Sequence, residues 1–84
     1  MTNEAISRLV EMKLDSEEAI NIHFKQRSTI TGLFIKGKDY EDLRSKNFWR
    51  IVTKPNIEQW KKTKDLNLAR IFHGTEFTKL SDVS

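Results

Sequence analysis

Residues 19–25, AINIHFK, alternate between apolar and polar side chains, and this alternation constrains the fold more than any other feature of the chain. Ile20, Ile22 and Phe24 lie on one face of an extended segment, and the polar side chains between them lie on the other. Successive side chains of a β-strand point to opposite faces of the sheet. The pattern therefore predicts a strand with one buried face.

Four more short runs are rich in β-branched and aromatic residues, which favour strands. They are TITGLFIKG (29–37), FWRIVT (48–53), LARIFH (68–73) and TEFTKLS (75–81). Five strands of this length do not make a large flat sheet, but they can curl into a small barrel that hides its edges. Gly32, inside the second run, predicts a bend or bulge there. Gly74 separates the last two runs, which form either a tight hairpin or one strand that kinks into the next.

The chain begins with a helical rather than a strand pattern. Ala5, Ile6, Leu9 and Val10 recur at helical spacing in residues 3–13 and predict a short amphipathic helix. We expect Ile6, Leu9 and Val10 to pack over one end or face of the barrel. Residues 38–47 and 54–67 are interpreted as connections, each containing at most one helical turn. The predicted fold is one mainly β domain, residues 1–84, with an N-terminal helix and a strongly bent five-stranded antiparallel barrel.

The 84 residues include no cysteine, which excludes disulfides and thiolate metal sites and favours a reducing compartment. No apolar run approaches the roughly 18 residues of a membrane helix. We therefore expect a cytoplasmic protein with no membrane partner.

The net charge of +3 is unevenly distributed along the chain. Residues 1–20 hold two basic and five acidic side chains, whereas residues 36–64 hold nine basic and four acidic ones. This surplus fits an anionic partner, and it equally fits a solvated lysine-rich face.

The sequence contains no arrangement of residues that predicts catalysis. Asp39, Glu41 and Asp42 lie close together but in a charged segment expected to be solvated, where acid–base chemistry has no support. His23 and His73 are isolated and have no cysteine partners, so no metal site is predicted. We expect no enzyme activity and no cofactor.

Two stretches resemble the motifs of the Sm-like family, which includes the eukaryotic Sm and Sm-like proteins and bacterial Hfq. ITGLFIKGKDY is similar to the family's first motif, through Gly32, Phe34 and Asp39. IFHGTEFTKL is similar to the second, through Phe72, His73 and Gly74. The resemblance implies an Sm-like barrel, which has an SH3-like fold, and a homo-oligomer in which the last two strands pair across neighbouring subunits.

The resemblance also implies an RNA site. Loop residues of family members line a central pore and hold bases, and the matching positions here are Asp39, Asn47, His73 and Gly74. An amide such as that of Asn47 can read a base edge, and a glycine permits close approach. These residues also suit ordinary turns, in which Gly74 would supply a positive φ.

Aromatic residues beside lysines suggest further contacts with RNA. Tyr40 lies in a charged segment, and Trp60 is followed by Lys61, Lys62 and, after one threonine, Lys64. An aromatic ring can stack on a base while lysines meet phosphates. Trp60 can instead anchor its segment on the barrel or lie in a protein interface.

Two functions remain open at this point. The first is a non-catalytic RNA-binding protein that uses the basic surface. The second is a protein-interaction or structural module of the SH3-like type, with an acidic protein as a possible partner. The charge distribution favours the first, whereas the insertion before Asn47 and a histidine at the family's basic position favour the second.

Overall fold

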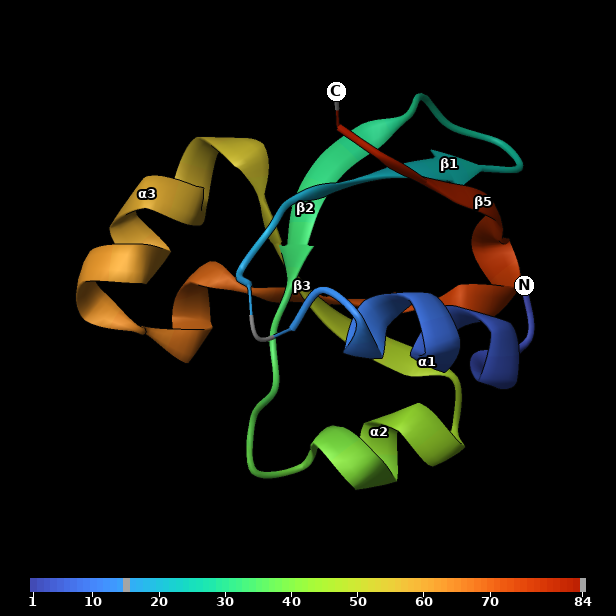
Figure 1. Ribbon diagram of the computed structural model, residues 1–84, viewed down its shortest axis with the longest axis horizontal. Helices are drawn as coiled ribbons and strands as arrows, with labels where there is room; N and C mark the ends of the chain where they lie inside the picture. Colours follow the sequence, from blue (N-terminus) through green and yellow to red (C-terminus); the bar gives the residue numbers. More distant parts are fainter. Residues whose placement is uncertain (15, 84) are drawn as a thin grey trace.

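The five predicted strands are present in the structure, a computed structural model that describes residues 1–14 and 16–83 (Figure 1). Their bounds are β1 Ile20–Phe24, β2 Ile30–Phe34, β3 Phe48–Thr53, β4 Arg70–His73 and β5 Phe77–Asp82. In β1 the alternation works as predicted, because the apolar face is buried and the intervening side chains are only half-buried.

The strands form one antiparallel sheet in the order β4-β3-β2-β1-β5. β4 and β5 follow each other in the sequence but lie at opposite edges of the sheet. Only the 3₁₀ turn η2, Gly74–Glu76, separates them. The hairpin alternative is therefore wrong, and the chain kinks at Gly74 from one edge of the sheet to the other.

The sheet bends strongly around a shared core, because such a short link must join its two edges. The Phe77 ring on β5 lies 5.3 Å from the Phe24 ring on β1 and 6.4 Å from the Phe34 ring on β2. Phe24 also lies 5.8 Å from Phe72 on β4. The described strands pair only in the stated order, so β4 and β5 remain the two edges of an open sheet.

The N-terminal helix α1, Asn3–Glu11, begins where the Thr2 hydroxyl accepts a hydrogen bond from the Ala5 N–H (3.2 Å). Ile6 and Val10 are fully buried against the sheet, as expected. Leu9 was expected to pack with them, but its side chain is 39% exposed. The expectation for Leu9 is wrong because only the Ile6–Val10 stripe faces the sheet.

Two further helices make the domain α+β rather than mainly β. The helix α2, Tyr40–Ser45, and the helix α3, Lys54–Thr63, replace the two expected connections. Pro55 suits the first turn of α3, and Lys64 ends it in a left-handed conformation (φ 56°). Figure 1 shows α3 on the opposite side of the sheet from α1 and α2.

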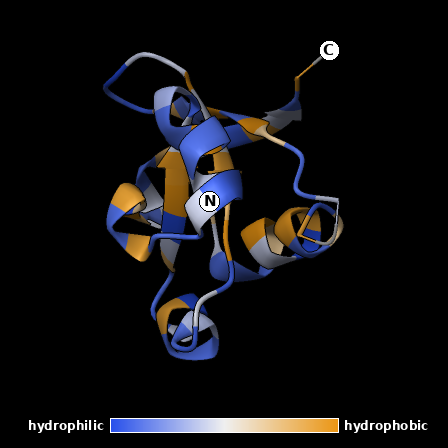
Figure 2. Cartoon of the chain, turned by 90° about the vertical axis from the view of Figure 1, so that its left-hand side faces the viewer, coloured by the Kyte–Doolittle hydropathy of each residue, from blue (hydrophilic) through white to orange (hydrophobic). Residues whose placement is uncertain are grey.

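The helices give the molecule two apolar clusters. Ile6, Val10 and Tyr40 join the aromatic core, whereas Trp60 covers Leu33, Ile35 and Val52 on the outer side of β2 and β3. Figure 2 shows hydrophobic and hydrophilic residues alternating along the helices. Among the described residues, no helix has the length and apolar character needed to cross a membrane.

Gly32 permits close packing between strands rather than a bulge. A Cβ there would lie 2.6 Å from Ile51 Cγ2 and 3.2 Å from the Val52 carbonyl oxygen. β2 pairs regularly on both sides of Gly32. A register irregularity occurs instead between His23 and Phe24 of β1.

Candidate functional site

Asn47 joins three separate parts of the chain through internal hydrogen bonds. Its Nδ2 donates to the Met1 carbonyl (3.1 Å), and its Oδ1 accepts from Trp49 Nε1 (2.8 Å). Its carbonyl accepts from the Gly74 N–H (2.7 Å). Its φ of 62° is a left-handed conformation that asparagine tolerates better than most residues. These contacts occupy the amide that the resemblance assigns to a base.

Gly74 and His73 lie beside Asn47, so three of the predicted RNA-contact residues come together. Gly74 is buried and has no positive φ. The alternative in which this glycine serves a turn by supplying a positive φ is therefore wrong. A Cβ at Gly74 would collide with Asn47 Oδ1 and Ile6 Cδ1. His73 Nδ1 accepts from the Thr75 N–H (3.2 Å) and lies 2.6 Å from the Thr75 hydroxyl, and this contact caps η2.

Asp39 and Tyr40 lie at the start of α2, whereas Asn47 lies beyond its end. Asp39 precedes α2 and forms an ion pair with Arg50 (2.7 Å), whereas Asn47 follows the C-cap of α2. Tyr40 is 6% exposed and packs edge-on against Trp49. Burial raises the pKa of the Tyr40 phenol, and its hydroxyl has no hydrogen-bond partner among the described residues. In this arrangement the Tyr40 ring has no free face for a base.

The basic tract lies on and after α3. Trp60 is 9% exposed within its apolar cluster, with Lys64 Nζ 5.4 Å from its ring centroid. Lys64 also forms an ion pair with Glu17 (2.9 Å). Lys61 and Lys62 are exposed and make no ion pair with any residue that the structure describes. The burial of Trp60 agrees with the alternative in which its ring anchors α3 on the sheet.

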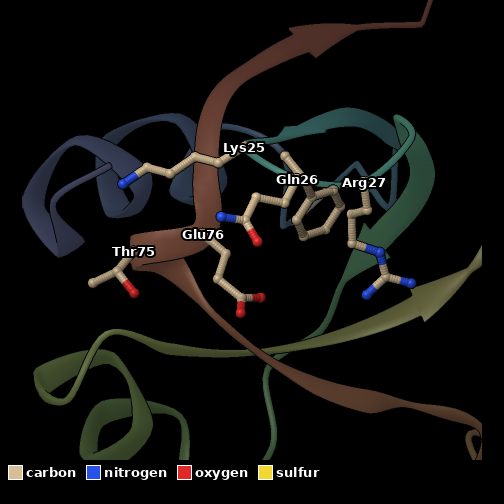
Figure 3. A pocket seen from close by; sticks show the side chains of 6 residues that line it. Lys25, Gln26, Arg27, Thr75 and Glu76 are labelled. Atoms are coloured by element: carbon tan, nitrogen blue, oxygen red, sulfur yellow. The ribbon is translucent and has the colours of Figure 1, made fainter.

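A cavity of about 350 Å³ lies between the β1–β2 turn and η2. Its volume is within the range typical of small-ligand sites. Figure 3 shows the Gln26 amide and the Glu76 carboxylate pointing into the same space, with the Arg27 guanidinium across from them. The lining residues are Phe24, Lys25, Gln26, Arg27, Thr75 and Glu76.

Aromatic contacts and one backbone hydrogen bond hold the walls of this cavity. The Arg27 guanidinium carbon lies 5.1 Å from the Phe24 ring centroid and 5.9 Å from the Phe72 ring centroid, close enough for cation–π attraction. The Lys25 N–H donates to the Glu76 carbonyl (3.0 Å) and ties the β1–β2 turn to η2. The two turns that line the cavity are therefore joined through the backbone, and they carry exposed polar side chains.

The described residues leave more cations than anions without an ion pair. Counting only partners among the described residues, five of the fifteen lysine and arginine side chains form ion pairs, and ten do not. Five carboxylates in the same residues are likewise unpaired, which are Glu4, Glu11, Glu58, Asp65 and Glu76. Lys25 and Arg27 at the cavity and Lys61 and Lys62 on α3 belong to the cationic surplus.

Sequence reasoning missed the cavity because its two walls are about fifty residues apart in the chain. KQR follows a strand and TE follows a glycine, and each stretch reads alone as an ordinary turn. Only the pairing of β5 with β1 brings the turns together. In residues 1–14 and 16–83, no three acidic or histidine side chains gather as a metal site would require.

No family model, curated protein or solved structure matches this chain. Its function is therefore inferred from its own residues.

Proposed function

We propose that this protein is a non-catalytic Sm-like module that binds single-stranded RNA. One observation carries the proposal: at the cavity, the exposed Arg27 guanidinium is held over the rings of Phe24 and Phe72. Arginine planes and aromatic rings are the usual stacking surfaces for unpaired bases. The Arg27 guanidinium thus offers a stacking surface at the cavity.

The order of elements supports the Sm-like part of the proposal. A helix precedes five strands, Gly32 lies within β2, and Gly74 lies between β4 and β5. We propose that the bent sheet is a small barrel left open between β4 and β5. Unpaired strand edges favour pairing with another chain, so neighbouring copies would join through these two strands.

The exposed lysines of α3 support an electrostatic contribution to binding. Each phosphate contact with single-stranded RNA adds about 0.7 to the slope of log affinity against log salt. Because Lys61 and Lys62 lack ion pairs in the described part of the chain, both are available for phosphates. Lys64 is already engaged with Glu17 and would contribute less.

A protein-interaction module is the second candidate. Ile71 on β4 is 53% exposed, and Leu9 and Met12 near β5 are 39% and 73% exposed. Exposed apolar side chains next to unpaired strand edges suit a protein partner.

Titration of oligo-U and oligo-A RNA at two salt concentrations tests the leading function. We expect salt-sensitive binding, with a slope that falls by about 1.4 in the Lys61→Gln/Lys62→Gln double variant, or about 0.7 per lost contact. Glu58→Gln/Gln59→Ala changes the same helix without removing a cation and serves as the control. If the wild-type protein shows no salt-sensitive RNA binding at low ionic strength, the RNA proposal fails and the protein-interaction module replaces it.

A further inference from the structure

The cavity between the β1–β2 turn and η2 combines three kinds of polar group in a small space. Glu76 supplies a carboxylate, which only accepts hydrogen bonds when ionised, and Gln26 supplies an amide that both donates and accepts. Arg27 supplies a planar cation. The Gln26 amide and the Glu76 carboxylate point toward the same volume (Figure 3).

The Glu76 carboxylate is free to meet a ligand. It forms no ion pair and accepts no hydrogen bond within the described residues, although Lys25 and Arg27 line the same cavity. The backbone that carries it is constrained, because the Glu76 carbonyl accepts from the Lys25 N–H (3.0 Å) and His73 caps the turn η2. The site thus combines an exposed acceptor, carried on a held turn, with the stacking surface of Arg27.

The four RNA bases differ in what they offer to such an acceptor. The Watson–Crick edge of guanine carries one acceptor, O6, followed by two adjacent donors, N1–H and N2–H. A carboxylate accepts both donors at once, and an adjacent amide N–H donates to O6. Adenine, cytosine and uracil each present a single donor next to an acceptor that would face the carboxylate.

We propose that this cavity binds an unpaired guanine. The base stacks on the free face of Arg27, Glu76 accepts from N1–H and N2–H, and Gln26 donates to O6. With RNA as the source of the base, the inference rests on the proposed function, but the same chemistry would recognise a free guanine nucleotide.

The test compares short oligo-U RNAs that differ at one central position, which is guanine, inosine, adenine or uracil. The wild-type protein should bind the guanine RNA about tenfold more tightly than the adenine or uracil RNA, a typical value for one bidentate contact. Inosine lacks the N2 amino group and should bind more weakly than guanine. A wild-type protein that binds all four RNAs equally overturns the guanine site and leaves RNA binding in place.

Two variants separate recognition of the base edge from stacking. Glu76→Gln should abolish the preference for guanine, whereas Glu58→Gln, an exposed carboxylate on α3, should preserve it. Arg27→Ala should weaken binding of all four RNAs to a similar extent. The variants are compared at equal folded fraction by circular dichroism. A preference that survives in Glu76→Gln overturns the assignment of that carboxylate.

Guanosine monophosphate provides the second arm of the test. If no RNA binds, the RNA proposal fails, and the guanine site is then decided by nucleotide titration followed by amide NMR shifts. Shifts at Gln26, Arg27 and Glu76 that vanish in Glu76→Gln uphold the site with a free nucleotide as ligand. Absence of such shifts, together with absence of RNA binding, overturns it.

Discussion

At the scale of single residues, the contact between Asn47 and Gly74 holds the end of β4 against the start of β3. The Gly74 N–H donates to the Asn47 carbonyl (2.7 Å), and the Asn47 side chain fills the space where a Cβ of residue 74 would lie. The same side chain satisfies Trp49 Nε1. Both residues are therefore required by packing, whatever else they contact.

Gly74→Ala should destabilise the fold because its methyl group has no room. The collisions with Asn47 Oδ1 and Ile6 Cδ1 should lower the free energy of unfolding by about 1 to 3 kcal/mol. For a domain this size, each kcal/mol lowers Tm by roughly 4 to 8 °C. Gly37→Ala is the matched control, since a Cβ there meets only Asp39 Oδ1 at 3.2 Å. Equal Tm values for the two variants would contradict the packing role.

Residue types alone predicted part of this arrangement. The sequence marked Asn47, His73 and Gly74 as special, and the structure brings the three together. It did not reveal that the Asn47 amide is used internally, because one partner, Met1, lies at the other end of a 46-residue separation, and the contact with Trp49, two residues on, depends on the local fold. The charged neighbours of Tyr40 predicted a loop residue, whereas in the structure Tyr40 begins α2 and its ring packs against Trp49.

At the scale of elements, α3 is a helix whose apolar spacing was present in the sequence but was not used to predict it. Ile57 and Trp60 are three residues apart, and both pack against the second apolar cluster. Together with Pro55 in the first turn, this spacing is typical of an amphipathic helix. The abundance of lysines in residues 54–64 instead favoured a solvated connection. The strands were predicted better, because alternation and β-branched residues occur within each strand itself.

Trp60→Ala tests whether this residue anchors α3. Removing a buried tryptophan should cost about 3 kcal/mol or more and lower Tm markedly. Because the ring faces Leu33, Ile35 and Val52, RNA affinity per folded molecule should remain unchanged. Urea denaturation gives the stability, and RNA titration at equal folded fraction gives the affinity. A selective loss of RNA affinity with unchanged stability would favour base stacking by Trp60 instead.

The ion pair between Glu17 and Lys64 links the segment before β1 to the end of α3, and it should depend on pH. The hydrogen bond from Lys64 lowers the pKa of Glu17 from its ordinary value of 4.5. A lowered pKa means that the pair stabilises the fold above pH 4.5, and this contribution disappears as the pH falls through the lowered pKa.

Thermal melts of the wild-type protein and Glu17→Gln across this range test the link. The Tm of the variant should be slightly lower near neutral pH, because an exposed pair contributes little. The two Tm values should converge in acid. Glu4→Gln, which removes a carboxylate without an ion pair in the described residues, is the control. A difference that persists or grows in acid would contradict the assignment.

At the scale of the whole molecule, the main unpaired surfaces are the two open edges of the sheet. β4 and β5 each pair with one neighbour, and the kink at Gly74 holds them at opposite edges. Because the sheet edges are the site of the proposed self-association, a test must change an edge without damaging the core. Phe77 is unsuitable, since its side chain is fully buried and Phe77→Lys should unfold the protein.

Ile71→Lys is the appropriate change, because Ile71 lies on β4 and its side chain is 53% exposed. A charge on an edge strand opposes strand pairing between chains, so the variant should behave as a monomer of about 10 kDa. The wild-type protein should show a larger mass by light scattering at micromolar concentration. Leu66→Lys places the same charge at a residue that is 43% exposed but lies in the turn η1 rather than in a strand, and should retain the larger mass. A wild-type mass of one chain at all concentrations would contradict self-association. Loss of assembly in both variants would show that the effect comes from net charge rather than from the β4 edge.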